Sequence, residues 1–587
     1  MITDQHSFYA RLAALFCVLL IAAPVGTLST ASAQAQSQAQ TAPPPPAQQA
    51  PAQRPAAPPL RVSTRLVQVN VIVEDKKGEP VTRLAKDDFT LLDGGQPQTI
   101  AFFAEETNQA PPAPPAAPAV ASAPAAHTFS NRFEEKAGVP TSVTVILLDA
   151  LNTHFTDMAY ARAQVKKFLK QLHPGDRVAL YGLSNELYVL HDFTQDADSL
   201  LQALDNSKNT ENFHVGASEE TPADTGDDNV DAFMDQAAHR IAEYANIDRV
   251  NLTAEALEAI ADHLAGMPGR KNLVWVSGAF PINMTGDTAL QWITFGDEIE
   301  SAARALNNGN IAVYPVDARG LIANADPGQA PGALGPTARR MQTRPPTTRM
   351  SPPHENFDTM NMLADRTGGR ASYNNNDING AVRRAIDDSR VTYVLSYYPT
   401  HGEWDGKFRE IKVQVKRPGT QIRYRRGYFA LPDEAPDPNR QKQQLVDAVV
   451  SPLESTALGL QIQAEPADIP TGRQLKAHIL VDYKQMLFAQ QNGRWVDHLE
   501  FVWVQLAADG HSLGTKDQTL DFNLLPSLYE TVQKNGLGMT TKVDVRNDTT
   551  ELRLVARDAG TGAIGSVNIP LRSLYTQNKP AAASPQN

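Results

Sequence analysis

The sequence has a single cysteine among its 587 residues. Cys17 lies inside an apolar run from Leu12 to Ala23, which precedes a small-residue site at Ala31-Ser32-Ala33. This pattern is typical of a secretory signal peptide over residues 1–33, cleaved before Gln34. An uncleaved anchor is the alternative, because only Arg11 precedes the run closely. After cleavage no cysteine remains, which excludes disulfides, thiolate metal sites and thiol nucleophiles.

Positive charge and long apolar runs are also scarce. The 53 Lys and Arg against 65 Asp and Glu give a formal net charge of -12. Nucleic-acid binding normally requires a basic face, so we expect no nucleic-acid partner. Beyond the amino-terminal run, no stretch reaches the ~18 apolar residues of a membrane helix. We therefore expect a periplasmic or secreted protein with no membrane span after signal cleavage.

Sequence motifs of common enzymes are missing. There is no Gly-x-x-x-x-Gly-Lys phosphate loop and no His-Glu-x-x-His zinc helix. Gly182-Leu183-Ser184-Asn185-Glu186 has the serine of a nucleophile elbow but lacks its final glycine. His154 could act as a base or ligand, although a solvent-facing loop histidine is the more common case. We expect a non-enzymatic protein, with an unrecognised hydrolase using Ser184 or His154 as one alternative.

Composition shifts divide the chain into parts. Stretches rich in Pro, Ala and Gln cannot bury enough apolar surface to fold and predict linkers. The predicted parts are a disordered linker at 34–59, an N-terminal β unit at 60–105, a Pro/Ala linker at 106–139, an α/β domain at 140–390, strands completing the β unit at 391–430, a linker and short helix at 431–450, a β-sandwich of immunoglobulin type at 451–575 and a disordered tail at 576–587.

One apolar stretch organises the α/β part. Thr144 to Leu148 is a continuous apolar run that ends in Asp149, followed closely by Asn152 and Thr153. Such a run suits a strand buried on both faces of a parallel sheet. Strands and helices alternate from 142 to 390, which predicts a doubly wound, mostly parallel sheet. In such sheets ligands bind in the crevice at the carboxyl ends of the strands.

These features resemble the von Willebrand factor type A (VWA) domain. The likeness extends to the VWFA-related family of exported bacterial proteins, best known from Acidobacteria, and covers about Arg61 to Ala430. The residues that carry it are Val67 to Val71 through Asp88-Phe89, Leu148 to Thr153, Pro268-Gly269-Arg270-Lys271, Val313 to Gly320 and Thr367-Gly368-Gly369. The resemblance implies a VWA-type fold with a binding face at the strand ends.

The resemblance also implies a metal-ion-dependent adhesion site (MIDAS), which holds a divalent ion completed by a partner's carboxylate. Its pattern is Asp-x-Ser-x-Ser, a Thr in a second loop and a further Asp. Asp149 matches the first Asp, Thr153 the second Ser, and Thr253 the loop-two Thr, unless Thr253 lies within a helix.

Two ligands of that pattern are missing. Leu151 replaces the first Ser, and Ser277 stands where the second Asp belongs, while Asn152 is one position out of phase. Because Mg²⁺ prefers charged oxygen ligands, we expect weak binding or none. The alternative is that Asp149, Asn152 and Thr153 only cap the loop by hydrogen bonds to the backbone.

The predicted function is protein–protein or surface interaction through the loops at the carboxyl ends of the strands. The partner is a protein or a cell-surface component. An acidic stretch at 211–231 and a basic stretch at 323–353 are predicted to flank this face. The other alternative is a structural scaffold of the cell envelope that assembles through its β domains.

Overall fold

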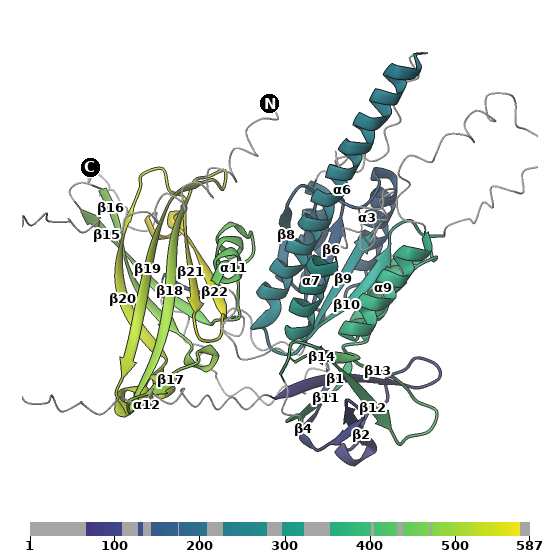
Figure 1. Ribbon diagram of the computed structural model, residues 1–587, viewed down its shortest axis with the longest axis horizontal. Coiled ribbons are helices and arrows are strands. Elements are labelled where there is room, and N and C mark those ends of the chain that lie inside the picture. The colour runs from purple at the N-terminus through teal and green to yellow at the C-terminus, as the bar shows by residue number, and fades with distance from the viewer. Residues whose placement is uncertain are drawn as a thin grey trace, which may run out of the picture. The chain divides into compact units, whose positions relative to one another are not determined.

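The computed structural model describes residues 66–107, 127–132, 142–173, 175–207, 227–278, 296–321, 353–400, 404–430, 438–469 and 472–575. These residues form a mixed α/β fold with several sheets (Figure 1). Parallel strand pairs occur within one five-stranded sheet, and the other sheets are antiparallel. The predicted signal peptide, the 34–59 linker, the tail, and most of the acidic and basic stretches lie outside the described residues.

The five-stranded sheet contains the predicted central strand. Its order is β10 (Ile311–Asp317), β9 (Arg270–Ser277), β6 (Ser142–Asp149), β7 (Val178–Leu183) and β8 (Leu187–Thr194). The first four strands are parallel, and the edge strand β8 pairs antiparallel with β7. All eight residues of β6 are buried, as expected for a strand with helices on both faces. A mostly parallel arrangement thus describes this sheet and not the chain as a whole.

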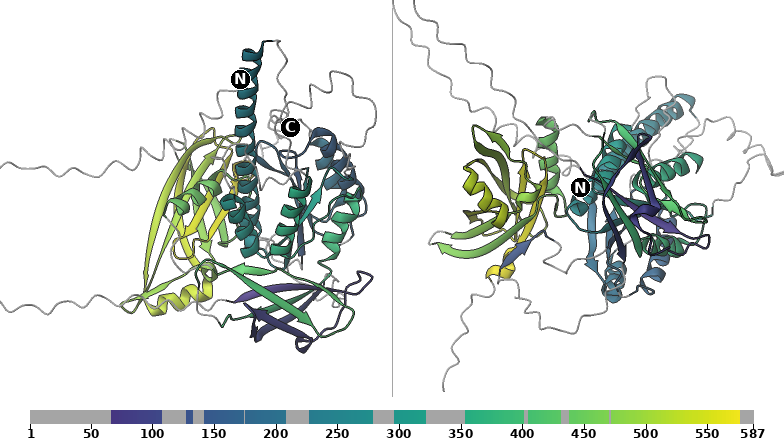
Figure 2. Two further views of the ribbon diagram at one scale, coloured as in Figure 1. Left: turned by 45° about the vertical axis from the view of Figure 1, so that its right-hand side comes forward. Right: turned by 90° about the horizontal axis from the view of Figure 1, so that it is seen from below.

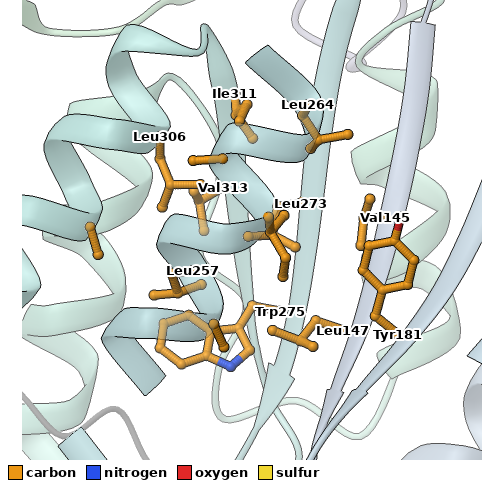
Figure 3. Packing of buried hydrophobic residues seen from close by; sticks show 14 of the residues in the cluster. Val145, Leu147, Tyr181, Leu257, Leu264, Leu273, Trp275, Leu306, Ile311 and Val313 are labelled. Atoms are coloured by element: carbon orange, nitrogen blue, oxygen red, sulfur yellow. The ribbon is translucent and has the colours of Figure 1, made fainter. Parts of the chain in front are cut away.

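Alternate residues of β6 contribute to two separate cores. Val145 and Leu147 pack with the helices α6 (Asp228–Ala265), α7 (Gly296–Asn308) and α9 (Pro353–Thr367). Ile146 and Leu148 pack with α3 (Phe155–Leu169), α4 (Ala197–Asn206) and α10 (Ile378–Asp387). Figure 3 shows the first of these cores, where Trp275 of β9 lies among leucines of the sheet and of α6. The period of two along the strand therefore places one helix layer on each face.

The chain on both sides of the α/β domain forms a second unit of two four-stranded sheets. One has the order β13 (Gln421–Arg423), β1 (Val67–Glu74), β11 (Val391–Tyr397), β4 (Ile100–Thr107). The other has the order β14 (Gly427–Phe429), β12 (Phe408–Val415), β2 (Phe89–Asp93), β3 (Gln96–Gln98). Val69 pairs with Leu395, and both are buried in a shared core. Strands separated by about 300 residues of sequence thus complete one β unit around the inserted α/β domain.

The carboxyl-terminal part follows α11 (Pro438–Val450) and consists of two facing sheets. The first sheet has the order β20 (Leu537–Val545), β16 (Gly472–Val481), β15 (Leu460–Ile469), β5 (Thr128–Ser130). The second has the order β17 (Ala489–Gln491), β18 (Arg494–Leu506), β21 (Glu551–Asp558), β22 (Ile564–Pro570), with β19 (Ser512–Leu524) also paired to β18. Inward-facing residues of both sheets share one core. Counted along the chain, β15, β16 and β20 are the first, second and fifth long strands, and they face β18, β21 and β22, the third, sixth and seventh. This division of strands between two sheets is that of immunoglobulin-like sandwiches.

One detail differs from the sequence predictions. The Pro/Ala linker predicted at 106–139 contains β5, because Phe129 packs on the sandwich core and Ser130 pairs with Gln461 of β15. At the other end of the loop after β6, α3 begins at Phe155, and the residue before it, His154, has the extended backbone of an N-cap. Short strands such as β5 depend on contacts distant in sequence, which a local pattern does not report.

Candidate functional site

The carboxylate of Asp149, at the end of β6, is fully buried and accepts hydrogen bonds on both oxygens. Oδ1 accepts from the backbone N–H of Asn152 at 3.0 Å, and Oδ2 accepts from the side-chain amide of Asn152 at 2.9 Å. Two groups of β9 also donate to Oδ2, the indole Nε1–H of Trp275 at 2.9 Å and the hydroxyl of Ser277 at 2.8 Å. β9 lies beside β6 in parallel register, so both donors face the carboxylate.

Asn152 joins this carboxylate to α6. Its amide also donates to the hydroxyl of Thr253 at 2.8 Å, and its carbonyl oxygen accepts from Arg249 Nε at 3.1 Å. Thr253 in turn donates to the backbone oxygen of Arg249 at 2.6 Å, one helical turn earlier. All three side chains are buried. The network therefore runs from a buried arginine on α6, through a neutral amide, to a buried carboxylate on β6.

The two flanking loop residues have different roles. Leu151 is fully buried in the core on the α6 side of the sheet, so its side chain fills the core. The hydroxyl of Thr153 accepts the backbone N–H of Gly278 at 2.7 Å, which ties the loop after β6 to the loop after β9. A Cβ on Gly278 would lie 3.2 Å from Thr153 Cα, so the two loops approach closely there.

The structure brings together the residues that the MIDAS pattern singled out. Asp149, Asn152, Thr253 and Ser277 share one hydrogen-bonded network, and Thr153 lies next to it. Thr253 is within α6 and still reaches the site, because this helix packs directly on the strand ends. Asn152 points into the site, although a one-position shift from the pattern suggested otherwise.

Hydrogen bonds within the protein already engage the oxygens that would coordinate a divalent ion at this site. A metal is coordinated by oxygen lone pairs of charged or neutral ligands, and the side-chain oxygens of Asp149, Asn152 and Thr253 each accept at least one hydrogen bond from the protein. The neighbouring buried carboxylate, Asp317 at the end of β10, is similarly engaged: Arg319 donates to its two oxygens at 3.0 and 2.9 Å. Among the residues that the structure describes, no three His, Cys, Asp or Glu side chains lie close enough to hold a metal.

Burial raises the pKa of Asp149, and the hydrogen bonds from Asn152, Ser277 and Trp275 oppose that rise. A buried ionised carboxylate is costly unless several donors satisfy it. The four donated hydrogen bonds provide this compensation from within the protein. The network therefore ties the loop after β6 to the end of β9 and to helix α6.

Two members of the network were missed from the sequence. Trp275 precedes Ser277 by two residues, so the strand period places both side chains on the face of Asp149. Arg249 precedes Thr253 by four residues, so both lie on one face of the helix. Both signals exist in the sequence, but they become useful only when β9 and α6 are known to flank β6.

The hydrolase alternative names two residues, Ser184 and His154. Ser184 occupies the β7–β8 hairpin, where its N–H donates to the backbone oxygen of Glu186 at 3.1 Å. His154 precedes α3 and is half-buried. Near it, burial raises the pKa of Asp157, while His154 and Arg319 act to lower it.

The described residues also include no helix long and apolar enough to cross a membrane.

No family model matches the chain. No curated protein matches it either. Similar solved structures include von Willebrand factor type A domains. One from Catenulispora acidiphila is 9% identical, covering 60% of this chain and 81% of that chain, with a TM-score of 0.24. An aerotolerance-related membrane protein from Bacteroides fragilis is 15% identical, covering 43% and 99%, with a TM-score of 0.23.

The PilB minor pilin from Streptococcus sanguinis is 11% identical, with 43% of this chain and 62% of that chain covered and a TM-score of 0.23. TM-scores this low carry no argument about this chain. The description of its fold therefore rests on the strand order and pairing given above.

Proposed function

We propose that the chain is an exported, non-enzymatic member of the VWFA-related type, whose VWA-type α/β domain binds a protein or a cell-surface component without a metal ion. The binding face is the end of the five-stranded sheet where β6, β9 and β10 terminate. The hydrogen-bonded network around Asp149 holds the loops of this face in place. In a MIDAS, a bound metal ion has this role.

The observation that carries the proposal is the exposure of large apolar side chains around this end of the sheet. Phe155 directly follows the loop after β6, and Leu321 follows β10, and both are exposed. The exposed Tyr160 donates its hydroxyl to the backbone oxygen of Asn376, whose side chain accepts the N–H of Leu321 at 2.9 Å. Exposed apolar groups on ordered elements are typical of protein interaction surfaces.

The metal-independent character is supported by the donor set. Every oxygen that the MIDAS pattern would supply from Asp149, Asn152 and Thr253 accepts an internal hydrogen bond. Removing those donors would leave buried polar groups unpaired, at about 1–3 kcal/mol each. A divalent ion would have to displace several of them at once.

A pull-down from the protein's own envelope extract tests this proposal. The double variant Phe155→Ser with Leu321→Ser should lose the retained component, and chelator should leave retention by the unaltered chain unchanged. Phe102→Ser is the matched control, because Phe102 is also an exposed aromatic residue but lies on β4 of the β unit. Retention that survives the double variant, or that requires a divalent ion, would contradict the proposal.

A further inference from the structure

The amino-terminal half of α6 presents a regular apolar stripe to solvent. Val230, Met234, Ala237, Ile241 and Tyr244 follow one another at intervals of four, three, four and three residues. This spacing places them along one face of a helix. The four large side chains among them are 44%, 42%, 53% and 70% exposed, and Phe233 beside them is 68% exposed. We call Val230, Met234, Ala237, Ile241 and Tyr244 the α6 stripe, and Phe233 borders it.

The α6 stripe lies beyond the hydrogen-bonded network around Asp149. Arg249 and Thr253 of α6 contact Asn152 at the end of β6, and from Val250 onward the core-facing residues of the helix are buried. At 1.5 Å per residue, Val230 lies about 30 Å further along the helix than Arg249. Figures 1 and 2 show this half of α6 projecting past the strand ends of its own domain.

The spacing of the stripe favours an α-helix as the element that packs on it. Side chains repeating every 3.5 residues on average form a seam that a second helix fills with knobs-into-holes packing. Two heptads are too few for a coiled coil that is stable by itself, but they match the anchor pattern of helix-to-helix recognition. Large aromatic and aliphatic residues such as Phe233, Ile241 and Tyr244 are common anchors of such interfaces.

Charge determines which helix fits. From 227 to 244 the sequence has five acidic residues and one arginine. Asp227, Asp231 and Asp235 lie near the amino-terminal end of the stripe, and Arg240 lies near its middle. A second copy of the chain would bring two such acidic segments together, and the whole chain carries a net charge of -12. A partner helix with basic flanks has complementary charge, which favours association and excludes like-charged partners.

We propose that the α6 stripe docks an amphipathic helix of a partner protein whose flanking residues are Lys or Arg. This inference rests on the proposed function, because it names the partner class of the same end of the α/β domain. The rigid helix, held at its base by Arg249 and Thr253, presents the stripe already formed. Docking then orders only the partner.

A synthetic helical peptide tests this assignment. The probe has leucines at four- and three-residue spacing and lysines at the flanking positions, and its binding to the purified full chain is followed by fluorescence anisotropy. The double variant Ile241→Gln with Tyr244→Gln should weaken binding about tenfold or more, which is about 1.4 kcal/mol. Glutamine is a good helix former, so the helix is retained, as far-UV circular dichroism would verify.

Ala232→Gln is the matched control. Ala232 is exposed on the same half of α6 but off the stripe, and its change should leave the affinity within about twofold. A peptide with glutamates in place of the lysines should bind much more weakly, and so should a lysine peptide with scrambled leucine positions. Equal binding by the double variant or by the scrambled peptide would overturn the proposal.

Sedimentation of the chain alone tests whether a second copy of the chain binds to the α6 stripe instead. A monomer is expected, and a dimer that Ile241→Gln with Tyr244→Gln dissociates would show that a second copy occupies the stripe and would overturn the proposal. If the peptide does not bind while envelope retention still depends on Phe155 and Leu321, this inference fails and the proposed function stands. If envelope retention depends neither on Phe155 and Leu321 nor on Ile241 and Tyr244, the proposed function fails as well.

Discussion

Arg249 Nε donates a hydrogen bond of 3.1 Å to the side-chain oxygen of Asn152, whose amide nitrogen donates to Asp149. A buried cation and a buried carboxylate are thus joined through one neutral amide. In a MIDAS the positive charge near the first Asp comes from a metal ion. Here Arg249 places a positive charge near the same position, and groups of the protein donate hydrogen bonds to Asn152 and Asp149.

Replacing Arg249 should destabilise the α/β domain. Arg249→Met keeps much of the side-chain volume but leaves the Asn152 oxygen without this donor. We expect a loss of about 2 kcal/mol or more in the free energy of unfolding, measured in urea. Arg240→Met, at an exposed position of the same helix, should change it by less than about 0.5 kcal/mol. Equal effects of the two variants would show that Arg249 has no special role.

The indole of Trp275 should contribute as a donor and not only as a packed ring. Trp275→Phe retains an aromatic ring in the core but removes the Nε1–H that bonds Asp149. We expect a loss of about 1–3 kcal/mol in unfolding free energy. Adding Asp149→Asn to Trp275→Phe should cost less than the sum of the two single changes, because the residues interact. Strict additivity in this double-mutant cycle would count against the contact.

Gly369 should not tolerate a side chain. A Cβ at this position would lie 1.8 Å from the backbone oxygen of Val313 in β10. Gly369→Ala should therefore separate β10 from the turn after α9 and lower the melting temperature by several degrees, a loss of about 2 kcal/mol. Gly538→Ala is the control, because nothing lies within 4 Å of its Cβ position. A melting temperature unchanged by Gly369→Ala would contradict the close packing.

The sandwich contains a pair of buried carboxylates that should make its stability depend on pH. Burial raises the pKa of Asp497 well above 3.8, and the neighbouring Asp558 carboxylate adds to the rise. Between the ordinary and the raised pKa, the folded chain keeps a proton that the unfolded chain releases. The free energy of unfolding should therefore fall as pH rises through this window.

Asp497→Asn removes that titration. Between about pH 5 and about pH 8 the variant should lose less unfolding free energy than the unaltered chain, by about 1 kcal/mol or more. Urea unfolding at the two pH values measures the difference. The same pH dependence in both proteins would show that Asp497 does not hold the proton.

The sequence predicted the core strand of the α/β domain well, because an uninterrupted apolar run from Val145 to Leu148 has few alternatives to a strand buried on both faces. It also indicated the polar residues at the strand end. It did not reveal that β5 leaves a Pro/Ala-rich stretch to join the sandwich, since its three residues have no pattern of their own. Such short strands form because a distant edge is available for pairing.

For the site, the comparison with the MIDAS pattern identified Asp149, Thr153 and Thr253 and noted the mismatches at Leu151 and Ser277. The contribution of Trp275 and Arg249 could not be read from that pattern, which contains neither residue. Their positions follow from the pairing of β6 with β9 and from the packing of α6 on the strand ends. Sequence periodicity gives the face of each element, but only the tertiary arrangement shows which faces meet.

Calorimetric titration of Mg²⁺ and Mn²⁺ into the purified chain tests the metal-independent account most directly. Because the oxygens of Asp149, Asn152 and Thr253 already accept internal hydrogen bonds, we predict no saturable heat at millimolar metal. Saturable binding that disappears in Asp149→Ala would contradict the account.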